Sequence, residues 1–118
     1  MCISEKKLIF ALAYYQAMNN KDLVAIERHL HKEVRLISPL ADLKGKGEVL
    51  NSIKHLISFL NKVIIRAEFA VKDQVMLAYD IEFPLPIGIS QAAVLLTFQD
   101  GLIIGYELFF DPRPFEKI

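Results

Sequence analysis

The sequence predicts an α+β fold in which three N-terminal helices pack in the concave face of a curved, mostly antiparallel sheet. Two observations predict it. Apolar residues recur at helical spacing before about residue 62, and beyond that point they alternate with polar residues, as in strands. A sheet that folds around preceding helices forms a cone-like α+β barrel with a cavity. The chain has 118 residues, 53% of them hydrophobic, and we expect a single domain over 1–118.

The first half of the chain carries three helical patterns. We expect helices over residues 5–18, 22–30 and 48–60. Asn19 and Asn20 end the first helix, because asparagine tolerates the left-handed conformation. Asp22 is the expected N-cap of the second. A short strand over 34–37 follows and is stopped by Pro39.

The second half carries four longer strand patterns. We expect strands over residues 63–71, 75–83, 90–98 and 102–110. Short turns join neighbouring strands, which makes the meander antiparallel. The tail after Asp111 contains two prolines, and we expect it to be irregular.

Alternation assigns strand side chains to the two faces of the sheet. In the strand expected over residues 63–71, one face should hold Ile65, Ala67, Phe69 and Val71. Arg66, Glu68, Asp80 and Glu82 are expected on the outer face, where they could pair across strands. Tyr106, Leu108 and Phe110 share the concave face of the last strand.

Composition excludes several classes of function. Fourteen basic residues balance fourteen acidic ones, so nothing attracts the chain to nucleic acid or to an anionic membrane. The apolar run 8–15 is too short to span a bilayer and lacks a signal-peptide cleavage pattern, so a cytoplasmic location is expected. The single cysteine, Cys2, cannot form an intramolecular disulfide. The three histidines lack metal-ligand spacing, so neither a metal nor another cofactor is expected.

The order of these elements, together with three local motifs, resembles the nuclear transport factor 2-like superfamily, which includes SnoaL-like and ketosteroid isomerase-like proteins. The motifs are Tyr-Tyr-Gln-Ala-Met-Asn-Asn-Lys-Asp-Leu at 14–23, Glu-Val-Arg-Leu at 33–36 and Lys-Gly-Lys-Gly-Glu-Val-Leu at 44–50. The resemblance implies a conical apolar pocket and pairing of two copies through the outer sheet face. Members include isomerases, polyketide cyclases, dehydratases and epoxide hydrolases, and also proteins without catalytic activity.

The resemblance also indicates which catalytic groups this chain retains. Tyr14 matches the tyrosine that donates to the substrate oxygen in ketosteroid isomerases. Ser38, before Pro39, stands where they have the aspartate base, and Leu96, ahead of Phe98, stands where they have a neutral aspartic acid. Serine without an activating base cannot abstract a proton near neutral pH, and leucine donates no hydrogen bond. Steroid isomerisation is therefore not expected.

Other side chains are candidates for a ligand site. Asp111, at the end of the last strand, could replace the missing base. The expected pocket lining is Tyr79, Leu96, Phe98, Tyr106, Leu108 and Phe110. Tyrosines also serve as ordinary core residues, so Tyr14, Tyr79 and Tyr106 could instead pack with their hydroxyls bonded to neighbours. His29 and His31 are expected at the surface, and His55 falls between inner positions of its helix.

Two functions follow from this pattern. The first is a small-molecule-binding domain with an apolar conical pocket, in which Tyr14, Ser38 and Asp111 supply polar groups. Such a domain could be an isomerase, lyase or cyclase, although the carboxylates of the ketosteroid isomerases are missing. The alternative is a non-catalytic homodimerisation or protein-association module. Its expected surface is the outer face of the sheet.

Overall fold

The computed structural model describes residues 3–116, and Cys2 lies outside this range. Three helices precede the long strands, as expected. The helices are α1 (Ile3–Asn19), α2 (Leu23–Arg28), α3 (Lys46–Ile57) and the single-turn α4 (Arg113–Glu116). Asp22 caps α2, because its Oδ1 accepts a hydrogen bond from the Ala25 N–H at 3.1 Å.

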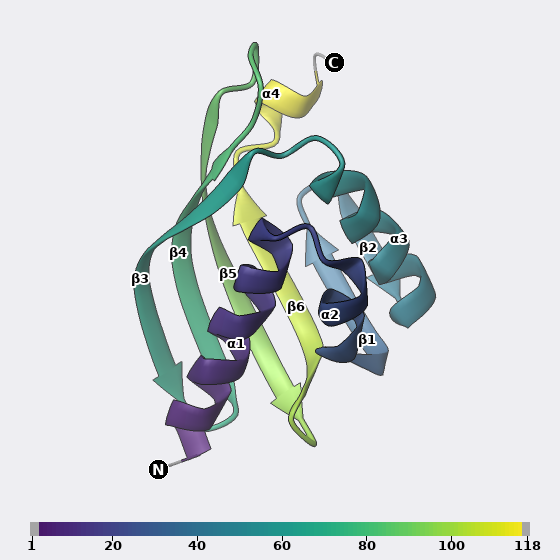
Figure 1. The fold of residues 1–118 in the computed structure, drawn as a ribbon, viewed down its shortest axis with the longest axis vertical. Coiled ribbons are helices and arrows are strands. Elements are labelled where there is room, and N and C mark those ends of the chain that lie inside the picture. The colour runs from purple at the N-terminus through teal and green to yellow at the C-terminus, as the bar shows by residue number, and fades with distance from the viewer. Residues whose placement is uncertain (1–2, 117–118) are drawn as a thin grey trace.

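Six strands form one curved sheet (Figure 1). They are β1 (Leu30–Ser38), β2 (Ala41–Lys44), β3 (Lys62–Val71), β4 (Gln74–Glu82), β5 (Ile89–Gln99) and β6 (Leu102–Phe110). The spatial order is β2-β1-β6-β5-β4-β3. All neighbours are antiparallel except β1 and β6, which run parallel because the whole meander separates them in the chain.

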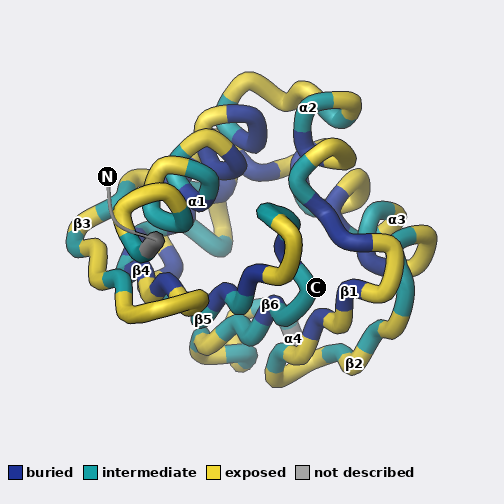
Figure 2. Tube along the Cα trace, turned by 90° about the horizontal axis from the view of Figure 1, so that it is seen from below, coloured by how far each residue is buried: buried dark blue, intermediate teal, exposed yellow. Residues whose placement is uncertain are grey.

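The helices lie in the concave face of this sheet. Figure 2 shows α1, α2 and α3 curving around one side of the sheet, with the buried segments facing inward. Contacts connect α1 with β3 and β4, whereas α3 packs on β1 and β2. The predicted α+β architecture, with helices in the hollow of a mostly antiparallel sheet, is confirmed.

Two elements were not predicted, and one was predicted too short. The segment Ala41–Lys44 reads as a loop in the sequence but forms β2, because it pairs back on β1 from Ser38 to Arg35. Pairing on both edges extends β1 to nine residues, where the pattern predicted four. Arg113–Glu116, expected to be irregular, forms α4.

A β-bulge at Arg66 reverses the predicted faces of half of β3. Ile65 pairs with Tyr79, but Ala67 pairs with Ala78, so Arg66 is an extra residue in the ladder. An inserted residue sends every later side chain to the other face. Phe69 is consequently 66% exposed, and the prediction that Ala67, Phe69 and Val71 share the inner face with Ile65 is wrong.

One predicted charge pair forms on the outer face of the sheet. The Nε of Arg66 lies 2.9 Å from Oδ1 of Asp80 on the neighbouring strand. Glu68 does not lie on that face, because after the bulge it is paired with buried Leu77, so its predicted outer position is wrong.

His31 was expected at the surface and is buried, with 8% of its area exposed. The helix before it ends at Arg28, so His31 belongs to β1, where its Nδ1 accepts the Glu33 N–H.

The turn after α1 fastens the helix to distant parts of the chain. The Asn19 side-chain amide donates to the carbonyl of Val63 at 2.9 Å and accepts the Val63 N–H at 2.7 Å, as a neighbouring strand would. Lys21 has a positive φ of 55°. Its ammonium donates to the carbonyl of Ile57, the last residue of α3, and to that of Leu60 just after the helix. One short turn thus positions both α3 and the start of β3.

We predict that Asn19→Ala lowers the free energy of unfolding by about 1–3 kcal/mol, because it leaves a partly buried N–H and C=O of Val63 unpaired. Asn20→Ala is the matched control, since Asn20 is exposed and its side chain makes no hydrogen bond within residues 3–116. We expect the control to stay within about 0.5 kcal/mol of the native protein in urea denaturation. Equal losses in the two variants would contradict this role of Asn19.

Candidate functional site

A cavity of about 250 Å³ lies between α3 and the concave face of the sheet. Strands β1, β4, β5 and β6 contribute its floor, α3 one wall, and the C-terminal helix α4 part of its rim. Most of the lining is aliphatic or aromatic. The lining residues are Leu36, Ser38, Leu40, Ala41, Ser52, Ile53, His55, Leu56, Phe59, Ile81, Phe83, Ser90, Tyr106, Leu108, Phe110 and Phe115.

The exposed lining side chains show where the cavity opens. Leu40, His55 and Phe59 are exposed and line it from the β1–β2 turn and the C-terminal part of α3. Tyr106 is buried and lies at the opposite, deep end. The floor formed by β6 runs from Tyr106 to Phe110, a distance of about 13 Å at the usual rise per strand residue. The cavity therefore has a buried end at Tyr106 and an open end beside α4.

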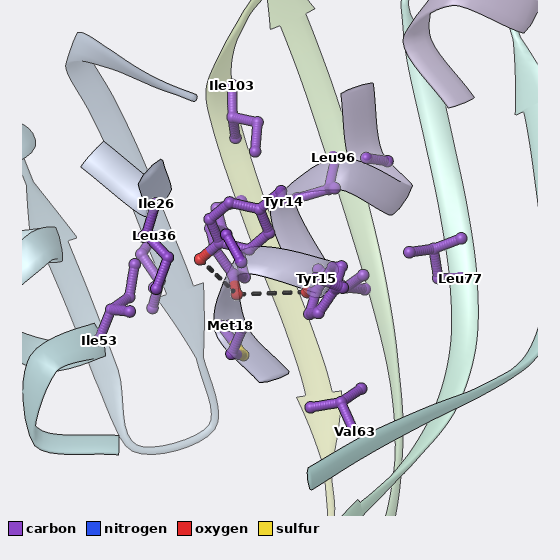
Figure 3. Close-up of a cluster of buried hydrophobic side chains, with 14 of the residues drawn as sticks. Tyr14, Tyr15, Met18, Ile26, Leu36, Ile53, Val63, Leu77, Leu96 and Ile103 are labelled. Atoms are coloured by element: carbon purple, nitrogen blue, oxygen red, sulfur yellow. Dashed lines mark hydrogen bonds between the residues drawn. The ribbon is translucent and has the colours of Figure 1, made fainter. Parts of the chain in front are cut away.

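Tyr106 belongs to a buried tyrosine cluster that contains every tyrosine of the chain: Tyr14, Tyr15, Tyr79 and Tyr106. The Tyr14 hydroxyl donates to that of Tyr106 at 3.2 Å. The Tyr15 hydroxyl lies 3.2 Å from that of Tyr106 and 2.9 Å from that of Tyr79. In Figure 3, Tyr14 and Tyr15 lie among the core side chains, and dashed lines join tyrosine hydroxyls.

The four hydroxyls carry four protons but make three hydrogen bonds with one another, so one proton remains for another acceptor. Three bonds link the cluster, and either oxygen can donate in the two bonds made by Tyr15. When Tyr79 donates to Tyr15, and Tyr15 to Tyr106, the spare proton belongs to Tyr106. Tyr106 is the member of the cluster that borders the cavity, and a hydroxyl that accepts two hydrogen bonds is a stronger donor of its own proton.

The surroundings also make Tyr106 the most acidic member of the cluster. Burial raises the pKa of Tyr14, Tyr15 and Tyr79 well above 10. Neighbouring tyrosines raise the pKa of Tyr14 and Tyr15 further, whereas for Tyr79 the effect of Tyr106 is opposed by the hydrogen bond with Tyr15. Burial raises the pKa of Tyr106 as well, but the hydrogen bonds from Tyr14 and Tyr15 act in the opposite direction. Near neutral pH all four groups remain neutral donors.

A SnoaL-like domain model matches residues 11–106, which include the second half of α1, most of the sheet and the tyrosine cluster. The chain belongs to the SnoaL-like family. A comparison with curated proteins gave no match.

Solved structures share the fold of this SnoaL-like chain, among them that of a nuclear transport factor 2-like protein. A protein from Kribbella flavida DSM 17836 is 27% identical with a TM-score of 0.87, over 93% of this chain and 90% of that one. A nuclear transport factor 2-like protein of unknown function from Cytophaga hutchinsonii is 22% identical with a TM-score of 0.80, over 91% of each chain. An LEH-like epoxide hydrolase from M. tuberculosis shares the fold at 14% identity, with a TM-score of 0.81 over 97% and 89% of the chains.

Two of the three residues predicted to act in catalysis lie apart from the cavity. Tyr14 is fully buried and reaches the cavity only through its hydrogen bond to Tyr106. Asp111 is exposed and forms an ion pair with Arg113 at 2.7 Å, which lowers the pKa of the carboxyl to about 2 and leaves it a weak proton acceptor. Ser38 does line the cavity, and its Oγ accepts the Leu40 N–H at 3.2 Å.

The predicted pocket lining divides into two groups. Tyr106, Leu108 and Phe110 border the cavity, whereas Tyr79, Leu96 and Phe98 lie in the closed core beneath α1. The division follows from where α1 sits: it fills the part of the sheet formed by β3 and β4, and the open space remains beside α3.

Sequence reasoning did not single out Ser52 or Ser90, which the structure brings to the cavity together with His55. Ser52 and His55 lie three positions apart on α3, and that spacing places them on one helix face. Ser90 is buried on the inner face of β5, and its side chain has no hydrogen-bond partner within residues 3–116. The inward position of Ser90 could have been predicted from the sequence, because Ser90 lies two and four residues before Ala92 and Val94, which are buried on the same face of β5.

Other kinds of site find no support in the described part of the chain. Within residues 3–116 no three His, Cys, Asp or Glu side chains are grouped in a way that could hold a metal ion. No helix in that range is both long and apolar enough to cross a membrane.

The tyrosine cluster predicts an unusual ultraviolet titration. Because all four tyrosines have raised pKa values, the native protein should show no phenolate absorption as pH passes 10, whereas denatured protein should titrate near 10. The unfolded state then loses protons first, so the free energy of unfolding should fall as pH rises above about 10. The chain has no tryptophan to obscure the band. Phenolate appearing near pH 10, in protein that circular dichroism shows still folded, would disprove the buried cluster.

Proposed function

We propose that this SnoaL-like chain is a small-molecule-binding domain that takes a neutral, mostly apolar ligand with an oxygen acceptor into the cavity beside α3. The observation that carries the proposal is the position of Tyr106. It borders an apolar cavity, and its hydroxyl is hydrogen-bonded to those of Tyr14 and Tyr15 in the core. Binding sites for small molecules typically combine an apolar lining with a few polar groups of this kind.

The charge of the lining supports an uncharged ligand. Among the lining residues that the structure describes, none is Asp, Glu, Lys or Arg. An ionised ligand would lose its hydration without gaining a counter-ion, which is costly in an apolar site. Ser38, Ser52 and Ser90 can satisfy a second oxygen of the ligand without requiring charge.

The volume of the cavity sets the size of the ligand. A space of 250 Å³ corresponds to about eight molecules of liquid water. At the packing density of protein interiors it accepts a compound of about ten to twelve non-hydrogen atoms. Such a ligand is a monocyclic compound with a short chain.

Chemistry of the isomerase, lyase or cyclase kind would use Tyr106, which would donate to the oxygen on which negative charge develops. His55 lines the exposed end of the cavity, so it would act as a base only on the part of the ligand that lies there. An LEH-like epoxide hydrolase shares this fold, so the fold accommodates catalysis.

The exposed apolar residues of the outer sheet face favour a second role, the pairing of two copies of the chain. Phe69 on β3, Met76 on β4 and Leu95 on β5 lie side by side in the ladder, and Phe69 and Met76 are 66% and 40% exposed. Ala78 and Ala93 form the next row and end at Phe109. A flat apolar surface of this kind is costly to leave in water. We propose that a second copy covers it, which is compatible with ligand binding on the concave side.

The proposed donor can be tested with 4-phenylbutan-2-one, a neutral ketone of suitable size. We predict that Tyr106→Phe raises its dissociation constant about 2- to 10-fold, the value of one hydrogen bond, in an NMR or calorimetric titration. Tyr79→Phe is the matched control, because it also removes a buried hydroxyl from the cluster but does not touch the cavity. 4-Phenylbutanoate, the charged analogue, should bind more weakly than the ketone at pH 8.

Two results would overturn the proposal. One is the absence of binding by neutral ketones in native protein that is folded. The other is equal affinity in the native protein and the Tyr106→Phe variant, which would remove Tyr106 from the site.

For the pairing surface, we predict that Met76→Lys weakens the dimer at least tenfold, because each copy would bury an unpaired ammonium group. Val24→Lys is the control, since Val24 is an exposed apolar residue on α2, away from the sheet. Sedimentation equilibrium over a range of concentrations measures both variants. A native protein that stays monomeric at high concentration would disprove the pairing.

A further inference from the structure

Four phenylalanine rings border the open end of the cavity. Phe59 stacks on Phe83 with 5.4 Å between ring centroids, and Phe83 meets Phe115 edge-on at 5.2 Å. Phe115 in turn meets Phe110 edge-on at 5.4 Å. All four rings line the cavity, and we call them the phenylalanine collar.

The collar is assembled from four separate parts of the fold. Phe59 follows α3, Phe83 follows β4, Phe110 ends β6, and Phe115 lies on α4. Figure 1 shows α4 just beyond the end of β6, near the start of β3. Since the rings come from separate elements, their contact depends on the tertiary structure that brings α3, β4, β6 and α4 together at this end.

Asp111 and Arg113 form an ion pair at the start of α4, the helix that carries Phe115. The backbone N–H of Arg113 donates to Oδ1 of Asp111 at 3.0 Å, and the guanidinium Nη2 donates to Oδ2 at 2.7 Å. This local structure begins α4 and turns Phe115 back onto Phe83 and Phe110.

We propose that the collar selects ligands that end in an aromatic ring, so that the site takes a neutral aryl-alkyl ketone or a related compound. The inference rests on the ligand site proposed above and adds the chemical class of the ligand. Its oxygen would lie at Tyr106 and its ring among Phe59, Phe83 and Phe115. The floor of about 13 Å between Tyr106 and Phe110 keeps these two ends apart.

The physical basis is the charge distribution of aromatic rings. A ring has a negative face and a positive edge, so ring pairs at centroid distances of about 4.5–7 Å attract each other beyond the effect of buried area. One well-placed contact corresponds to roughly 2- to 10-fold in affinity. A saturated ring of the same size buries similar apolar area but lacks this attraction.

The test compares 4-phenylbutan-2-one with 4-cyclohexylbutan-2-one, which have the same skeleton and the same ketone oxygen. We expect the native protein to bind the aromatic ketone roughly 3- to 10-fold more tightly in an NMR titration, after correction for the different solubility of the two compounds. In Phe115→Leu and in Phe59→Leu, both ketones should still bind, and the preference should fall below about twofold. Because Phe59 is 40% exposed, its variant retains a folded protein even if Phe115→Leu does not.

Phe10→Leu is the matched control, because Phe10 lies on α1, packs against Phe98 and does not line the cavity. It should keep the full preference for the aromatic ketone. Equal binding of the two ketones by the native protein would overturn the role of the collar while leaving the ligand site intact. Unchanged preference in both collar variants would overturn it as well. Failure of both ketones to bind the native protein would overturn the ligand site itself.

Discussion

Four buried tyrosine hydroxyls between α1 and the sheet hydrogen-bond to one another, and only that of Tyr106 also borders the cavity. An unpaired buried hydroxyl costs about 1–3 kcal/mol, so the cluster tolerates little displacement of the elements that supply it. Tyr14 and Tyr15 are adjacent on α1 and reach Tyr106 on β6 and Tyr79 on β4. The cluster therefore sets both the rotation of α1 about its axis and its position along the sheet.

This arrangement of α1 decides where the cavity can form. The helix and its tyrosines fill the hollow over β3 and β4, where Tyr79 and Leu96 are closed off. Space remains beneath α3, whose contacts are with β1 and β2. Tyr106 lies on the boundary between the filled and the open part, and so it is the one tyrosine that both joins the cluster and borders the cavity.

Two irregularities in the sheet shape its two faces. The bulge at Arg66 turns the end of β3 outward, and on β6 the ladder passes over Ile104, so that Ile103 is the buried residue before Tyr106. Bulges increase local twist and bend strands, which suits a sheet wrapped around helices. The same bulge moves Phe69 to the outer face, where it extends the apolar surface available to a second copy.

The sequence alone determined the fold class, three helices, four long strands and the resemblance to the superfamily, because these follow from local periodicity and the order of elements. It also indicated Ser38, Tyr106, Leu108 and Phe110, which do border the cavity.

Only the tertiary structure decided the strand pairing, the bulges and the partners of the buried side chains. Whether β2 forms, and where a strand bulges, depends on the partner strand, which local alternation does not contain. The hydroxyl partners of Tyr14 and Tyr15 lie 92 and 64 residues away, and the phenylalanine collar joins four distant elements. Such contacts exist only once the chain has closed into a cone.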